Sequence, residues 1–146
     1  MESAAVEPME SPCVCATLRM ATRAVARVYD QALEPFGLRT TQYSILARLD
    51  AEGPSPVGRL AGRLAMDRTT LAREAEPLVR LGLVEQSPGE DRRQRVLSLT
   101  PAGRSRLAAA LPAWKDAQRL VRNQLGYDRT QGLLGELRAL LGAVRI

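Results

Sequence analysis

The chain has 146 residues, of which 45% are hydrophobic, enough for one domain with a buried core and too many for a disordered chain. It has no histidine, which excludes Ser-His-Asp and Cys-His catalysis and histidine-ligated zinc sites. The net charge is +5, and 20 of the 21 basic residues are arginines. A guanidinium group suits phosphate and guanine edges, but an arginine-rich genome explains the same bias, so charge permits nucleic-acid binding without establishing it.

Residues 1–12 contain two prolines, two serines and three glutamates without periodicity, which predicts a flexible N-terminal tail. This acidic start is unlike a signal peptide, and no run of 18 apolar residues occurs, so we expect a cytoplasmic protein with no membrane partner. Because the cytoplasm is reducing, Cys13 and Cys15 are expected to remain thiols. Two thiols without histidine make a poor zinc site, and we expect neither a metal nor a cofactor.

Two helices are predicted in the first part of the domain. Apolar residues recur at three- and four-residue steps over residues 18–36, which predicts a helix of about five turns that ends before Gly37. Thr40 or Thr41 is the expected cap of a second, largely buried helix that ends at Gly53.

The next two predicted helices are short and joined by a tight turn. The first is expected to begin at Ser55-Pro56, a cap followed by a proline, and the second at Asp67. Gly82 is the expected end of the second helix. This arrangement predicts a helix-turn-helix whose second helix buries one face, formed by Leu71, Ala75 and Leu78.

After Gly82 the hydrophobic period changes from 3.6 to 2, which predicts a two-stranded β hairpin. The strands are expected over residues 83–87 and 95–99, with a charged turn at residues 88–91.

Two further helices are predicted after the hairpin. Thr100 is expected to cap the first, which runs to about Leu125, and Asp128 with Gln131 to form a capping box for the second. The last helix carries more leucines than one thin domain can cover, so we expect a two-fold homodimer. Its apolar residues are Leu133, Leu134, Leu137, Leu140, Leu141 and Val144.

Two groups of polar residues are candidates for contact with double-stranded DNA. The N-terminal part of a helix that enters the major groove meets base edges, and a narrow arginine-bearing turn fits the minor groove. Asp91 is expected to pair with the Arg93 side chain and fix its direction. The alternative is that both groups are solvated surface. The candidates are Arg68, Thr69, Thr70 and Arg73 on the helix and Asp91, Arg92, Arg93 and Arg95 on the hairpin.

Several motifs, in order and spacing, resemble the MarR (multiple antibiotic resistance regulator) family over roughly residues 13–146. The resemblance implies a mainly α fold: a winged helix-turn-helix with a two-stranded β wing over residues 38–100, and dimerisation helices over residues 13–37 and 101–146. The most specific motif is Asp91-Arg92-Arg93 followed by Leu99-Thr100-Pro101-Ala102-Gly103, and the supporting ones are Tyr43-Ser44-Ile45-Leu46, Leu60-Ala61, Asp67-Arg68-Thr69-Thr70-Leu71 and Leu81-Gly82-Leu83-Val84.

The family resemblance also implies a function. Such a protein is a sequence-specific transcriptional regulator, usually a dimeric repressor of a palindromic operator that a small ligand or cysteine oxidation releases. Two alternatives stay open: an architectural protein that binds DNA without reading it, and, less favoured, a small thiol enzyme, for which the sequence offers no general base. We therefore expect no enzyme activity.

Two sets of residues are candidates for receiving a signal. Cys15-Ala16-Thr17-Leu18 with Tyr29 is similar to the family's organic-hydroperoxide-sensing branch, and Cys13 lies beside it. The alternative is a pair of small core thiols. A cleft for a small aromatic or phenolic effector is the second hypothesis, with a simple core as its alternative. Its candidates are Met20, Tyr43, Leu46, Leu107, Leu111 and Trp114.

Overall fold

The computed structural model describes residues 12–144, so the predicted tail lies outside the described residues except for Pro12. The chain is mainly helical, with a small antiparallel sheet and a short 3-10 helix, η1. The elements are α1 (Val14–Leu33), η1 (Glu34–Phe36), α2 (Thr40–Glu52), β1 (Ser55–Pro56), α3 (Val57–Arg63), α4 (Arg68–Arg80), β2 (Val84–Pro88), β3 (Arg95–Leu99), α5 (Pro101–Leu125) and α6 (Tyr127–Ala143).

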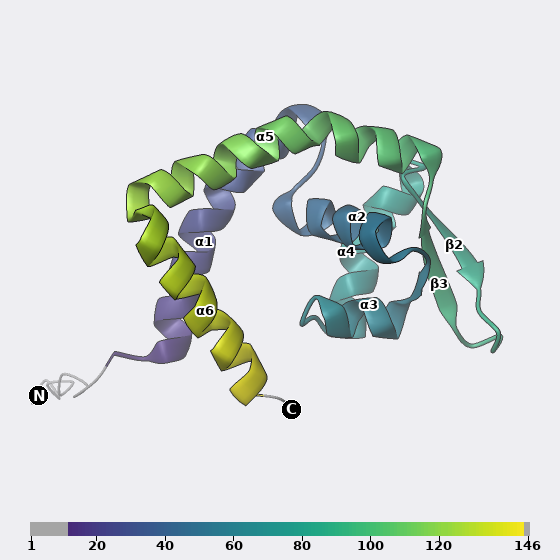
Figure 1. Ribbon diagram of the computed structural model, residues 1–146. Helices are drawn as coiled ribbons and strands as arrows, with labels where there is room; N and C mark the ends of the chain where they lie inside the picture. Colours follow the sequence, from purple (N-terminus) through teal and green to yellow (C-terminus); the bar gives the residue numbers. More distant parts are fainter. Residues whose placement is uncertain (1–11, 145–146) are drawn as a thin grey trace, which may run out of the picture.

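The long helix α5 connects two parts of the molecule (Figure 1). Its C-terminal half lies with α1 and α6 at one end, and the β2–β3 hairpin lies at the other. Between them α2 packs on both α4 and α5, and α3 packs on α4. This is the predicted mainly α winged helix-turn-helix, with the hairpin as the wing.

Two predicted helix caps are confirmed. The carboxylate of Asp67 accepts a hydrogen bond from the Thr70 N–H at 2.7 Å, and this bond is the main reason that the pKa of Asp67 is lowered. The Thr100 hydroxyl accepts from the Gly103 N–H at 3.0 Å. The first cap sets where α4 begins, and the second sets where α5 begins.

The predicted starts of three other helices are wrong. Arg39, not Thr40 or Thr41, is the N-cap of α2, because the Gln42 side chain accepts from the Arg39 N–H and the Asp30 carboxylate of α1 accepts from the Thr40 N–H. Ser55-Pro56 forms the strand β1, so α3 starts at the next residue. Gly126, not Asp128, precedes α6, where no side chain caps the helix.

The sheet has the strand order β1-β3-β2 and is antiparallel throughout. The wing is two-stranded, as predicted, with Val84 opposite Leu99 and Pro88 opposite Arg95. The third strand, β1, adds Ser55 opposite Leu97. A strand of two residues is too short to show alternation, which is why periodicity did not find it. The pairing joins the start of α3 to the wing.

The buried core lies mainly under α2, α3, α4 and the sheet. The predicted inward face of α4 is confirmed, since Leu71 and Leu78 are fully buried and Ala75 nearly so. By contrast, Thr130 is the single buried residue of α6, although that helix is rich in leucine. None of the helices in residues 12–144 has the length and apolar character needed to cross a bilayer.

Candidate nucleic-acid interface

A groove of about 790 Å³ lies between the start of α4, the start of α3 and the wing. It brings together candidates from both predicted groups, although they are more than 20 residues apart in the chain. Five of the eight candidates line it, together with Arg59, which no sequence pattern indicated. These lining residues are Arg59, Arg68, Thr69, Asp91, Arg93 and Arg95.

The other three candidates are placed differently. Arg73 is exposed on α4 but lines a neighbouring hollow of about 330 Å³ with Glu76, Arg80 and Gln86. Thr70 is half-buried, and its N–H is already bonded to the helix cap. Arg92 is exposed at the wing tip but is not part of the groove lining.

Arg68 lies directly over a glycine of α3. An ideal Cβ on Gly58 would come within 2.8 Å of Nη2 of Arg68 and 3.0 Å of its Cζ and Nε. The guanidinium group therefore occupies the space that any other residue at position 58 would fill. Neither Gly58 nor Arg59 stood out in the sequence, because only the angle between α3 and α4 brings them to the groove.

The wing tip is held by backbone hydrogen bonds. The Asp91 carboxylate accepts from the Arg93 backbone N–H at 3.1 Å, and the Asp91 carbonyl accepts from the Gln94 N–H at 2.9 Å. The predicted pairing of Asp91 with the Arg93 side chain is not among the ion pairs of the described residues. A bond to a backbone group two residues away fixes fewer rotatable bonds than a guanidinium pair, so the local turn is favoured.

The arginines of the groove lack the carboxylate partners that five other arginines of the described residues have. Arg39, Arg48, Arg80, Arg104 and Arg119 form ion pairs with carboxylates. Within residues 12–144, no ion pair includes any arginine of the groove or of the wing tip. Their charge is thus available to a polyanion, and it is focused by the walls of a groove.

The base of the wing is fastened to α5. The Thr100 hydroxyl donates to the Gly82 carbonyl at 2.6 Å, and the Thr100 N–H donates to the Leu83 carbonyl at 3.1 Å. Gly103 follows so closely that an ideal Cβ there would lie 2.1 Å from the Leu83 carbonyl oxygen. The contact explains why the motif of residues 99–103 contains this glycine.

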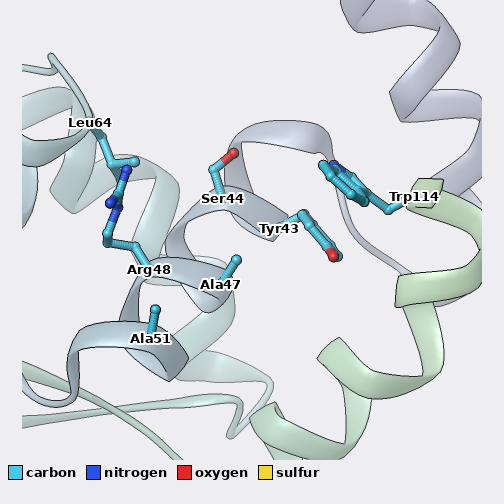
Figure 2. Close-up of a pocket in the computed structure, with 7 residues that line it drawn as sticks. All are labelled: Tyr43, Ser44, Ala47, Arg48, Ala51, Leu64 and Trp114. Carbon is cyan, nitrogen blue, oxygen red and sulfur yellow. The ribbon is translucent and has the colours of Figure 1, made fainter. Parts of the chain in front are cut away.

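A pocket of about 260 Å³ lies between α2 and α5 (Figure 2). Tyr43 and Trp114 are stacked at one end, with ring centroids 5.7 Å apart, and Arg48 lies toward the other end. Two of the six effector candidates therefore line this pocket. Leu46 and Leu107 belong to the core instead, while Leu111 and Met20 are exposed and outside the lining.

The candidates for redox sensing are not brought together within one chain. Cys13 is the N-cap of α1, where its Sγ accepts from the Ala16 N–H, and Cys15 lies one residue inside the helix; both are exposed. Tyr29 lies 14 residues further, about 21 Å along the helix axis. Its hydroxyl donates to the Gln118 side chain of α5, and burial raises its pKa against the opposing charge of Arg122.

A second, strongly apolar groove of about 430 Å³ lies between α1, α5 and α6. Val25 and Leu133 line it and are 39% and 47% exposed. Arg122 also lines it, and its Nε is buried without a hydrogen-bond partner among residues 12–144. We call this surface the helical groove.

Fold and site together define a winged helix-turn-helix regulator. No family model matches the chain. An uncharacterized HTH-type transcriptional regulator of Bacillus subtilis, YwoH, is 31% identical over 83 residues, which are 57% of this chain and 61% of that protein. The chain thus spans less than two thirds of this curated relative.

Solved structures match over more of the chain. The M. tuberculosis transcriptional regulator MosR in complex with DNA has a TM-score of 0.80 and 37% identity, covering 92% of this chain and all of that one. MarR of E. coli has a TM-score of 0.71 and 22% identity over 90% and 99% of the two chains, a likeness of fold. The chain belongs to the MarR family of winged helix-turn-helix transcriptional regulators.

Proposed function

We propose that this protein is a homodimeric regulator that binds a palindromic operator in double-stranded DNA and represses transcription. The observation that carries the proposal is the groove that joins the start of α4 to the wing and gathers four arginines, none of which has a carboxylate partner within residues 12–144. A helix in the major groove with an arginine turn in the adjacent minor groove uses such a surface. The relative MosR was solved in complex with DNA.

The helical groove supports the homodimer. Its exposed valine and leucine side chains form an apolar surface that a second copy of α1, α5 and α6 would cover. We therefore propose residues 13–37 and 101–146 as the dimerisation region and 38–100 as the DNA-binding lobe. Two-fold symmetry then sets the half-sites about 34 Å apart, one turn of DNA.

A pair of arginine variants tests the DNA-binding role. Arg73→Ala is expected to cost about 1–3 kcal/mol at one base position, because an arginine that reads a base contributes to discrimination. Arg93→Ala is expected to weaken binding to all sequences by similar factors and to flatten the salt dependence, because an arginine in the minor groove neutralises phosphate charge and distinguishes base pairs poorly. The measurement is a titration of each variant on a duplex selected by the wild-type protein and on a scrambled one.

Equal behaviour of the two variants would contradict this division of roles. Wild-type binding that falls steeply with salt but is equal on both duplexes would favour the architectural alternative instead.

We propose the Tyr43–Trp114 pocket as the site of a small aromatic or phenolic effector. A flat ring fits against two stacked aromatic side chains, and the pocket connects α2 of the DNA-binding lobe with α5. Because Trp114 is the single tryptophan, a bound phenol is expected to change its fluorescence and to release the duplex. Titration of phenolic acids with Tyr43→Ala as the comparison checks this, since that variant is expected to bind several-fold more weakly.

We propose oxidation of Cys15 as a second route to release. The exposed sulfur, as its thiolate, would attack the terminal oxygen of an organic hydroperoxide. The O–O bond breaks, the sulfur becomes a sulfenic acid, and the rest of the peroxide is released as the alcohol. Peroxide is expected to release the wild-type protein from DNA but not the Cys15→Ser variant, as followed by fluorescence anisotropy of a labelled duplex. Identical release curves would remove Cys15 from the mechanism, and Cys13→Ser is the matched control.

A further inference from the structure

The contact between Gly58 and Arg68 joins the two helices of the helix-turn-helix at the groove. Three atoms of the guanidinium group lie within about 3 Å of the position that a Cβ on Gly58 would take. The group therefore lies against the backbone of α3 at Gly58, and it does so without a carboxylate partner among the described residues. The absence of a side chain at position 58 leaves the space that the group occupies.

This contact has a consequence for recognition. The planar fork of an arginine binds two neighbouring acceptors only in one orientation. A Cβ at position 58 would displace the guanidinium group from its place in the groove. Arg68 also lies in the first turn of α4, where a helix-turn-helix meets the DNA.

We propose that Gly58 is a positioning residue, whose lack of a side chain leaves the space from which the Arg68 fork reaches two adjacent acceptors of bound DNA. The acceptors are O6 and N7 of a guanine or two oxygens of a phosphate, both of which a guanidinium group binds with two parallel hydrogen bonds. The proposal rests on the proposed DNA-binding function. It adds Gly58 to the residues on which binding depends, although Gly58 has no side chain that could contact DNA.

The chain offers a matched pair of variants for the test. Gly58→Ala adds a methyl group that displaces only the far end of the flexible Arg68 side chain, so the fold is retained. Gly62→Ala makes the same change in the same helix, where no atom lies within 4 Å of the new Cβ. Both changes raise helix propensity, so thermal unfolding is expected to show neither variant less stable than the wild type.

The experiment measures binding of the full chain to a duplex that the wild-type protein enriches from a random pool. Gly58→Ala is expected to bind on the order of ten-fold more weakly and Gly62→Ala to bind like the wild type. In an Arg68→Ala background, Gly58→Ala is expected to have no further effect, because its target is gone. A scrambled duplex distinguishes the acceptors: the loss is confined to the enriched duplex for a guanine and appears on both for a phosphate.

Three outcomes would overturn the proposal. In the first, Gly58→Ala binds the enriched duplex as tightly as the wild type. In the second, Arg68→Ala leaves the affinity unchanged. In the third, Gly58→Ala weakens binding equally whether or not Arg68 is present. None of these outcomes contradicts the proposed DNA-binding function. That function would be contradicted by a different result, namely that the wild-type protein enriched no duplex from the pool.

Discussion

Gly103→Ala is expected to lower the free energy of unfolding by about 3 kcal/mol, near the upper end of the usual range for overpacking. The new Cβ would lie 2.1 Å from the Leu83 carbonyl oxygen and 2.7 Å from a methyl group of Leu99, so backbone must move. The same carbonyl accepts the Thr100 N–H, and the movement would strain this bond as well. Thermal unfolding at one fixed protein concentration measures the effect, which corresponds to a shift of the melting temperature of roughly 10 °C.

The control for this prediction is Gly62→Ala, a helical glycine with open space around it. Its melting temperature is expected to equal or exceed that of the wild type, since alanine favours a helix by up to about 1 kcal/mol. A Gly103→Ala protein as stable as the wild type would mean that α5 and the base of the wing at Leu83 do not approach each other as described.

Leu133→Asp is expected to abolish the proposed dimer at micromolar concentration. The residue lines the helical groove, and a two-fold axis repeats each substitution, so two carboxylates would be buried without partners. An uncompensated buried charge costs about 3 kcal/mol or more, which for two charges raises the dissociation constant roughly 10⁴-fold. Sedimentation velocity measures the association state, and loss of the partner half is expected to remove most operator affinity.

Leu81→Asp is the comparison for this prediction. Leu81 is 55% exposed at the end of α4, outside the helical groove, and its substitution is expected to leave the dimer intact. A wild-type protein that is a monomer at these concentrations, or a Leu133→Asp dimer of undiminished strength, would contradict the proposed interface.

The fold could be predicted where the signal is local. The caps Asp67 and Thr100 act on N–H groups three residues away, so the residue type and its place before an apolar run were sufficient. The inward face of α4 and the two wing strands followed from hydrophobic periods of 3.6 and 2. These features hardly depend on where the rest of the chain lies.

Two of the three wrong helix starts arise where a distant residue decides. The start of α2 depends on Asp30, which reaches the Thr40 N–H from α1, and the strand β1 forms only because β3 lies beside it. The same reason explains the site. Arg68 and Arg93 were singled out as charged residues, but their common groove and the role of Gly58 depend on the packing of α3 against α4.

The short strand β1 also bears on the operators that this protein can accept. Because Ser55-Pro56 pairs with Val96-Leu97, the segment that leads into α3 and the arm that carries the wing tip form one sheet. The distance from the first turn of α4 to the base of the wing is thus fixed within one chain by this sheet. In the proposed dimer on a palindromic operator, tolerance for inserted base pairs is therefore expected at the centre of the operator, while the footprint of each half stays constant in length.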